Sequence, residues 1–411
     1  MAGSRKRVLF GQLVTMAEGP AAEPLGPGVL GIEDGRVAVI GPPDTGFEGE
    51  TLDFSRHLLI PGFVNAHAHL GLSVLAGRIP RGGVFADWIQ AVVATLEAVD
   101  PAERLAAMKP AAEALARSGV TFLAEYLPQA GQAADYADLP FRLLLFLELI
   151  GPDADRAAGA GRQAAAWLKG GTDLTGLRAR GLAPHAPYSA APALFESVRE
   201  LAGETGCPVS CHLAETGEEV EFLKTGRGPL RDFLDRRGAL DPGWQTPGTG
   251  PLRFLKQLGC LEGLQAVHLN HLEAEDSALL SGLGGAVFCP GSTRWFRRSR
   301  WMPVRRLLDA GVPVGLGTDS LASNEQLDFM REIRLAGAML PEVAPAEILW
   351  MATAGGARAC GVPAGTLEPG QYADFLAFPL PGPKAAWWEA VWDQPGPGPE
   401  AVFHRGVRWS G

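Results

Sequence analysis

The chain has 411 residues, of which 46% are hydrophobic, and a formal net charge of −10 at pH 7. This length and composition allow one barrel-sized core and a small second domain. The negative charge argues against a nucleic-acid partner, because a phosphate-binding surface needs clustered positive charge. No apolar run approaches the ~20 residues of a membrane-spanning helix, and the apolar stretch after residues 5–7 is too short for a signal peptide. We therefore expect a soluble, cytoplasmic protein with no membrane contact.

Three short strands are predicted near the N-terminus, at residues 7–16, 29–32 and 36–40, separated by turns rich in glycine and proline. Eight apolar runs follow, and stretches with helical spacing such as 102–118 and 193–205 lie between them. The runs cover residues 58–66, 120–125, 141–150, 181–184, 208–211, 264–267, 285–289 and 312–318. This alternation predicts an α/β fold, a (β/α)8 barrel of the TIM type. The long segment 224–262 between the fifth and sixth runs is expected to help cover the active-site mouth.

Histidines and one aspartate stand at the ends of several of these runs. His67 and His69 end the first run, and strand alternation puts both imidazoles on the same side. The others are His185 after the fourth run, His212 after the fifth, His268 after the sixth and Asp319 after the eighth. A lone histidine at a strand end is often a hydrogen-bonded core residue, and Asp319 could cap a helix. Five of the eight histidines at strand ends nevertheless favour a metal site.

In combination these motifs resemble the amidohydrolase superfamily, and more narrowly its mononuclear, metal-dependent aminohydrolase (deaminase) branch. The resemblance implies one divalent metal ion per chain, zinc or iron, bound by His67, His69, His212 and Asp319. It also implies catalytic roles for Glu215, His268 and Asp319. The fourth run contains no lysine that could bridge two ions after carboxylation. The chain also lacks the Cys-x-x-Cys pair of the other zinc deaminase design.

The resemblance extends to both ends of the chain. Residues 365–376 are similar to the family's C-terminal return into a small β domain, to which the N-terminal strands also contribute. We therefore expect a composite β-sandwich from residues 1–58 and 361–411 around a catalytic barrel from residues 59–360. The five cysteines are odd in number and lie mostly in apolar runs, which favours buried free thiols over disulfides.

The chemistry follows from the residue types. A divalent ion with three neutral imidazoles and one carboxylate keeps enough positive charge to acidify its bound water. Hydrolysis at an amidine-like carbon, such as C6 of adenine, also needs a proton on the adjacent ring nitrogen and one on the departing ammonia. Glu215, three residues after His212, is expected to deliver the first proton. His268 and Asp319 are expected to orient the water and accept its proton.

Four further residues are candidates for substrate binding. His185 and Ser323 resemble pocket residues of the family. Trp88 either caps the pocket or packs in a helix core. Arg294 is the candidate for binding an anionic or planar part of the substrate, with Arg78 and Arg81 as further options for a carboxylate. Three further arginines follow Arg294 closely in the chain and are expected to be solvated. They are Arg297, Arg298 and Arg300.

Within the family, residues 146–151 and 317–323 and the 224–262 segment are most similar to aminodeoxyfutalosine deaminases of the futalosine route to menaquinone. Their substrate, 6-amino-6-deoxyfutalosine, is a modified adenosine that bears a benzoate. Deaminases of S-adenosylhomocysteine, methylthioadenosine or adenosine are the near alternative. These deaminases carry a second arginine on strand 3 that binds the amino-acid carboxylate of the substrate. In this chain Arg142 is retained as the first of these arginines, and the second position is Leu147. A cyclic-amide hydrolase or a non-catalytic ligand-binding barrel is the alternative of another class. A homodimer is left open.

Overall fold

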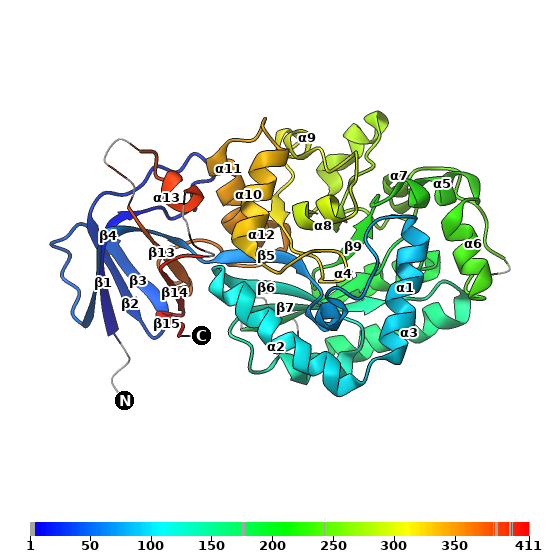
Figure 1. Cartoon of the computed structure of the whole chain (residues 1–411), viewed down its shortest axis with the longest axis horizontal. Coiled ribbons are helices and arrows are strands. Elements are labelled where there is room, and N and C mark those ends of the chain that lie inside the picture. The colour runs from blue at the N-terminus through cyan, green and yellow to red at the C-terminus, as the bar shows by residue number, and fades with distance from the viewer. Residues whose placement is uncertain are drawn as a thin grey trace.

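The computed structural model describes residues 5–171, 173, 177–241, 243–380, 382, 385–393, 396 and 398–410. Over these residues the strands form two sheets, one of eight and one of seven strands. Figure 1 shows the seven-stranded sheet on the left, with both ends of the chain, and the larger α/β part on the right.

Eight parallel strands form the barrel. They are β5 (Phe63–Ala68), β6 (Val120–Leu127), β7 (Arg142–Leu149), β8 (Arg178–Pro184), β9 (Ser210–Leu213), β10 (Gln265–His268), β11 (Gly285–Phe288) and β12 (Val314–Leu316). The pairing order is β8-β7-β6-β5-β12-β11-β10-β9, and a parallel bridge between Leu182 and Val209 closes the ring. The predicted TIM-type barrel is confirmed.

The first apolar run was read as one strand, and this prediction is wrong. Leu58 to Pro61 end β4 (Glu50–Pro61), which belongs to the other sheet, and the first barrel strand begins only at Phe63. Gly62 separates the two strands, and a Cβ atom there would lie 2.1 Å from Oγ1 of Thr121. The glycine therefore lets the chain pass from one sheet to the other against the start of β6.

The second sheet combines strands from both ends of the chain. They are β1 (Arg5–Leu13), β2 (Gly28–Glu33), β3 (Arg36–Gly41), β4, β13 (Phe375–Pro379), β14 (Ala401–His404) and β15 (Val407–Arg408). β4 is central, since it pairs parallel with β1 and antiparallel with β13. Alternate apolar residues such as Val8, Phe10 and Phe375 form a separate hydrophobic core within this sheet. The separate β-rich domain is confirmed, whereas the boundaries at residues 58 and 361 stay predictions.

Helices connect and cover the barrel strands. They are α1 (Phe85–Ala98), α2 (Pro101–Arg117), α3 (Ala154–Leu168), α4 (Pro192–Thr205), α5 (Gly217–Thr225), α6 (Pro229–Arg236), α7 (Pro251–Gln257), α8 (Pro290–Trp295), α9 (Val304–Asp309), α10 (Phe329–Met339), α11 (Pro345–Trp350) and α12 (Gly356–Ala359). A further helix, α13 (Glu389–Trp392), contacts β13 of the other sheet. Asp100, Asp153 and Thr216 begin α2, α3 and α5 by accepting backbone N–H bonds at the N-cap. The 224–262 segment forms α6 and α7, and α6 contacts α1 (Figure 1). Its covering of the site mouth stays a prediction.

Arg142 lies at the junction of the barrel and the β domain. Its guanidinium is 3.7 Å from the Asp374 carboxylate, 4.5 Å from the Tyr372 ring centre, and donates to the Pro363 carbonyl at 3.1 Å. Arg142 begins β7, so it is at the opposite end of this strand from the catalytic face of a TIM-type barrel. The reading of Arg142 as a retained substrate-binding arginine is therefore wrong. Leu147 packs in the main hydrophobic core.

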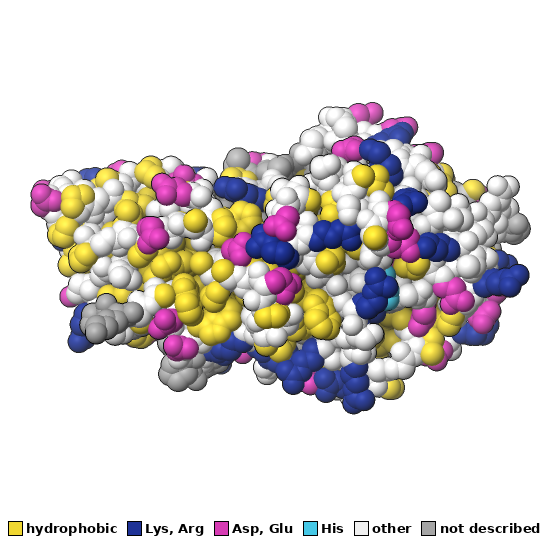
Figure 2. Space-filling view, turned by 90° about the horizontal axis from the view of Figure 1, so that it is seen from above, with side chains coloured by type: hydrophobic (Ala, Val, Ile, Leu, Met, Phe, Trp, Pro, Cys, Tyr) yellow, Lys and Arg dark blue, Asp and Glu magenta, His cyan; other side chains and the backbone are white. Residues whose placement is uncertain are grey.

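The face of the molecule drawn in Figure 2 carries both charges. Figure 2 shows lysine and arginine side chains interspersed with aspartate and glutamate on the face drawn. Among the described residues, no helix combines the length and apolar character needed to cross a membrane. The five cysteines are free thiols, and all but Cys260 are buried.

Candidate metal centre

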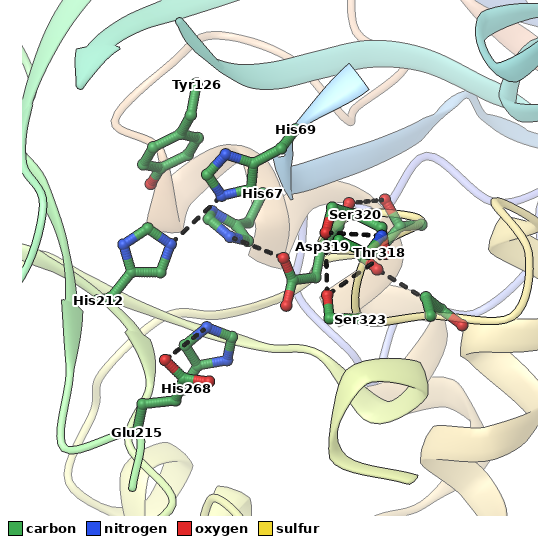
Figure 3. Close-up of polar contacts among 12 residues, drawn as sticks. His67, His69, Tyr126, His212, Glu215, His268, Thr318, Asp319, Ser320 and Ser323 are labelled. Carbon is green, nitrogen blue, oxygen red and sulfur yellow. Dashed lines mark hydrogen bonds and ion pairs between the residues drawn. The ribbon is translucent and has the colours of Figure 1, made fainter. Parts of the chain in front are cut away.

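Three histidines converge at the C-terminal end of the barrel strands. His67 lies in β5, His69 follows it directly, and His212 lies in β9. The Nε2 atoms of His69 and His212 are 3.3 Å apart, and the His67 ring centre is 4.8 Å from that of His69 and 4.9 Å from that of His212. Asp319 approaches from the β12 end, with Oδ1 3.9 Å from Nε2 of His67 (Figure 3). The structure thus brings together all four residues predicted to bind the metal.

The spacing of these atoms fits a single divalent ion. Two nitrogen ligands at ~2.05 Å from a tetrahedral ion lie about 3.3 Å apart, which matches the distance between His69 and His212. Both ring nitrogens of His67 are buried and have no hydrogen-bond partner in the structure. A buried polar atom without a partner costs free energy. A metal ion between His67, the two other histidines and the Asp319 carboxylate would supply the missing partner.

The protonation state also suits metal binding. Burial holds the pKa of His67 and of His69 well below the usual value, so both imidazoles are neutral at pH 7. Nδ1 of His212 lies 3.0 Å from the carbonyl of His185 and donates to it, which leaves the Nε2 lone pair of His212 for the ion. His67 and His69 can therefore act as ligands without first losing a proton.

The strand ends that carry the site have unusual backbone conformations. Asp319, His268 and Ala214 have φ values of +58°, +78° and +50°, in the left-handed region that non-glycine residues rarely adopt. Such a conformation costs on the order of 1–3 kcal/mol and persists where surrounding contacts enforce it. Here it turns the chain sharply after β9, β10 and β12, so that the side chains face one another rather than continuing along the strands.

Glu215 and His268 face each other on the other side of the cluster. Oε2 of Glu215 is 3.9 Å from Nε2 of His268, while Oε1 accepts a 2.6 Å hydrogen bond from Arg298 (Figure 3 shows the Glu215–His268 pair). Burial raises the pKa of Glu215, and Arg298 opposes this shift. Burial also keeps His268 neutral by lowering its pKa well below the usual value. A carboxyl and a neutral imidazole thus stand beside the histidine cluster, where each can exchange a proton.

Arg298 was predicted to be a solvated loop residue, and this prediction is wrong. Its side chain is only 11% exposed, pairs with Glu215, and lies 4.5 Å from the Phe296 ring centre. By contrast, Arg294 is exposed on α8, and its role in substrate binding stays a prediction. The other two candidate arginines form ion pairs near the surface, Arg78 with Glu103 and Arg81 with Glu325.

The remaining predicted pocket residues lie around this cluster. The half-buried His185 has its ring centre 4.9 Å from that of His212, and its Nδ1 is 2.6 Å from Oγ of Ser189. Ser323 is buried beside Ser320, with the hydroxyls 3.1 Å apart. The indole N–H of Trp88 donates to the Ala322 carbonyl at 3.0 Å, which fixes this ring against the β12 loop. Their roles in substrate binding stay predictions.

A second group of possible ligands, Glu148, His185 and His212, overlaps the first. Ligand atoms of these three residues lie within 4.8 Å of one another. The Nε2 atom of His212 faces His69 and its Nδ1 is bonded to a carbonyl, so His212 has no further nitrogen for a second ion. Burial raises the pKa of Glu148 to about 7. Glu148 and His185 are thus better placed to contact a substrate than to bind a second metal.

Glu148 also lines a pocket beside α3. The cavity has a volume of about 360 Å³. Its lining residues are Pro128, Glu148, Ile150, Arg156, Gly159, Ala160 and Gln163. Its walls combine apolar residues with one guanidinium, one carboxyl and one amide. Glu148 connects this pocket with the surroundings of the histidine cluster, since its carboxylate also lies within 4.8 Å of ligand atoms of His185 and His212.

Two contributors to the site escaped the sequence analysis. The ring of Tyr126, in β6, lies 4.4 Å from that of His67, and its hydroxyl bonds to Ser210, which places a buried aromatic ring against the cluster. Glu148 is the penultimate residue of β7. Alternation along the strand puts Glu148 on the same face as Leu144 and Phe146, which are in the barrel interior. An acidic residue on the interior face at the end of a barrel strand was the signal that could have identified it.

Comparison with known proteins agrees with this geometry. Residues 58–394 match the amidohydrolase family, and the chain belongs to that family. A 5-methylthioadenosine/S-adenosylhomocysteine deaminase from Natronomonas pharaonis is 32% identical over 373 residues, covering 85% of this chain and 79% of the relative. The corresponding deaminase from Pyrococcus furiosus is 31% identical over 372 residues, covering 86% and 82%.

Solved structures show the same fold. An adenosine deaminase from Xanthomonas campestris with bound zinc has a TM-score of 0.82 at 27% identity, covering 98% of this chain and 92% of the other. The Helicobacter pylori aminofutalosine deaminase has a TM-score of 0.81, covering 99% and 100%, but at 22% identity it supports the fold alone. The family and these relatives identify the chain as a metal-dependent hydrolytic deaminase, as predicted, and argue against a cyclic-amide hydrolase or a non-catalytic barrel.

Proposed function

We propose that this enzyme hydrolyses the 6-amino group of an adenine nucleoside whose ribose carries an extended, acid-bearing substituent. Relatives above 30% identity are named for nucleosides with a substituent at the ribose end, which supports the nucleoside class. The observation that carries the finer proposal is the pocket of about 360 Å³ lined by Arg156 and by Glu148, whose carboxylate also lies near His185 and His212. An adenine over the histidine cluster would leave its ribose and substituent to be received by such a cavity.

His67, His69, His212 and Asp319 would bind one ion, zinc or iron, which supplies a water acidified towards neutral pH. The buried Glu215 would take a proton from the attacking water and give it to the ring nitrogen next to C6. His268, neutral and 3.9 Å from Glu215, would hold the water in line and, with Asp319, assist its deprotonation. The water oxygen would become bonded to C6, and the new hydroxyl would then give its remaining proton, by way of Asp319, to the amino group. The C6–N bond breaks, the amino group leaves as ammonia, and C6 keeps the oxygen as a carbonyl.

At the other end of the nucleoside, Glu148 and His185 would bind the ribose hydroxyls, which they can reach beside His212. A carboxylate on the substituent would pair with Arg156, whose guanidinium lies 3.1 Å from Asp153 and donates to the Gly238 carbonyl at 3.3 Å. Arginine suits this task because its planar fork binds a carboxylate and packs on a ring. Ser323 and Trp88 would line the adenine side of the pocket.

Among acid-bearing adenine nucleosides we retain 6-amino-6-deoxyfutalosine as the substrate and futalosine as the product. Its benzoate is flat and anionic, and the cavity offers apolar walls at Pro128, Ile150 and Ala160 together with the Arg156 guanidinium. S-adenosylhomocysteine is the second candidate, since the curated relatives carry its name. Arg142 and Leu147 do not argue against S-adenosylhomocysteine as the substrate, because neither residue faces the site.

Steady-state ammonia release tests the proposal. Aminodeoxyfutalosine, S-adenosylhomocysteine, methylthioadenosine and adenosine should be compared side by side. We expect kcat/KM for aminodeoxyfutalosine to exceed that for adenosine by on the order of 10², which corresponds to ~3 kcal/mol from all the contacts that the substituent adds. Arg156→Met should erode this preference through KM, whereas Arg162→Met, on the exposed face of the same helix, should not. A higher kcat/KM for S-adenosylhomocysteine would reject the futalosine assignment, and equal values for all four would reject an acid-binding cavity.

A further inference from the structure

Among the described residues, Arg298 is the arginine in direct contact with a catalytic candidate. It lies in the turn between α8 and α9, where its backbone N–H donates to the Thr293 carbonyl at 3.1 Å. Its Nη2 donates to Oε1 of Glu215 at 2.6 Å, and the two side chains are 11% and 7% exposed. A charge-assisted contact of this length between buried groups is strong, and breaking it leaves an unpaired charge in the interior.

The main chain of Glu215 is held independently of Arg298. Its N–H donates to the Glu219 carboxylate at 2.8 Å, and its carbonyl accepts from the amide of Asn270 at 3.2 Å. The Glu219 carboxylate also accepts the Ala214 N–H at 3.0 Å. These contacts fix where the Glu215 side chain starts but not how its carboxylate is turned. The contact with Arg298 determines the rotation, since it occupies Oε1 and leaves Oε2 towards His268.

The guanidinium of Arg298 packs against two aromatic rings. Its centre is 4.5 Å from the Phe296 ring centre and 5.7 Å from that of Phe85. The backbone N–H of Phe85 donates at 2.7 Å to Glu218, only three residues from Glu215. Phe85, which packs on Arg298, is therefore hydrogen-bonded to residues 215–219, the short segment that also carries the Glu215 carboxylate. This arrangement keeps both partners in one geometry.

We propose that Arg298 is a positioning residue, which occupies Oε1 of Glu215 so that Oε2 alone exchanges the proton during deamination. The inference rests on the proposed function, because it requires Glu215 to move a proton between water and the ring nitrogen. When Oε2 gives its proton to the ring nitrogen, the negative charge left on the carboxylate is shared with Oε1. Arg298 stabilises that charge without touching the substrate.

The competing explanation is that Arg298 leaves Glu215 and binds the carboxylate of the substrate. The two explanations differ in what removal of the guanidinium changes. A positioning residue affects kcat for every substrate, with or without an acid group. A residue that binds the substrate acid raises KM only for substrates that have one.

The experiment compares Arg298→Gln, Arg298→Lys and the neighbouring Arg297→Gln, in the wild type and in a Glu215→Gln background. Arg297 is exposed and serves as the matched control. Rates are measured as single-turnover ammonia release, with adenosine and with aminodeoxyfutalosine. We expect Arg298→Gln to lower the rate of chemistry by about 10- to 100-fold for both substrates, with KM within about threefold. Arg298→Lys should be intermediate, because it keeps the charge but loses the planar fork.

In the Glu215→Gln background, Arg298→Gln should add less than about threefold, because the two residues act as one unit. Independent losses that multiply, or an effect confined to KM for the acid-bearing substrate, would overturn the proposal. If Arg298→Gln does not fold, the same comparison is made with Arg298→Lys, whose unchanged rate would also overturn it. Near-normal turnover by Glu215→Gln alone would instead reject the role of Glu215 in the proposed function.

Discussion

Asn65 and Thr318 join the two strand ends that carry the metal-binding residues. The Asn65 amide donates to Oγ1 of Thr318 at 2.8 Å, and its oxygen accepts the Thr318 N–H at 3.1 Å. Both residues are completely buried. Asn65 precedes His67 by two residues and Thr318 precedes Asp319, so this pair of hydrogen bonds sets the distance between two ligands from opposite ends of the barrel sequence.

Loss of this contact should weaken metal binding. Asn65→Leu removes both hydrogen bonds, and we expect metal affinity to fall about 10- to 100-fold, as is typical when groups that orient ligands are removed. Thr318→Val is the matched variant, since it keeps the bond from the Thr318 N–H and should lose less. Affinity is measured by competition with a chromophoric chelator. Equal affinity in both variants and the wild type would contradict this role.

The metal content should be one ion per chain. His212 cannot serve two ions at once, and the Glu148 group therefore does not form a second site. Elemental analysis of the purified protein should give one zinc or iron per chain. Chelation should abolish activity and lower Tm in the wild type, because the ion stabilises the folded state by mass action. His67→Ala should show neither the ion nor the Tm response. Two tightly bound ions per chain would contradict this prediction.

His268 should be needed for chemistry and not for metal retention. His268→Ala is expected to keep the ion and to lower kcat by on the order of 10² or more, the scale of general acid–base catalysis. His271→Ala, nearby in sequence and half-buried, is the control and should keep near-normal kcat. Elemental analysis and kinetics on the same preparations decide the result. Loss of the metal from the His268→Ala variant would instead make His268 a ligand.

Arg142 should matter for stability and not for substrate choice. Arg142→Met removes the guanidinium beside the buried Asp374 carboxylate, which keeps its hydrogen bond from the Arg405 N–H at 2.8 Å, and we expect a loss of about 3 kcal/mol at most. Chemical denaturation measures this loss, and the relative kcat/KM values of the substrates should stay unchanged. The double variant with Asp374→Asn should lose less than the sum of the single variants. A selective loss of activity towards acid-bearing substrates would restore Arg142 as a substrate residue.

Stability should fall in acid partly because of His404. Burial lowers the pKa of His404 to about 4 from its ordinary value of 6.5, so the folded state favours the neutral ring. The contribution of His404 to the free energy of unfolding is therefore fully present above pH 6.5 and is lost as the pH falls through about 4. The shift corresponds to at most about 3 kcal/mol. His404→Gln, in the β domain and remote from the metal ligands in sequence, should show a flatter dependence of unfolding free energy on pH between 7 and 4. An unchanged slope would contradict the assignment.

The sequence was sufficient for the parts of the fold and site that follow from local pattern. His67, His69, His212, His268 and Asp319 could be identified because parallel strands end at one face and the residue after each end is visible in the sequence. Leu58 to Ala66 could not be divided, because the run is apolar throughout and hydrophobicity does not say which sheet a residue joins.

Contacts between distant segments account for the rest. Arg298 looked like one of several solvated arginines, and only the folded chain brings it to Glu215, 83 residues earlier. Arg142 was misjudged for the same reason, since its partner Asp374 belongs to the far end of the chain. The pairing of one charged residue with another over such separations depends on the path of the backbone, which composition and periodicity do not encode.

The central position of β4 has a consequence for how the enzyme comes to bind its metal. β4 leads through Gly62 into the strand that carries His67, and it pairs with β13, near the end of the chain. The contact between Asn65 and Thr318 likewise spans 253 residues. A nascent chain therefore holds the metal-binding residues His67 and His69 long before it contains Thr318 or β13. Contacts this distant form slowly, so acquisition of the ion should be among the last events of folding.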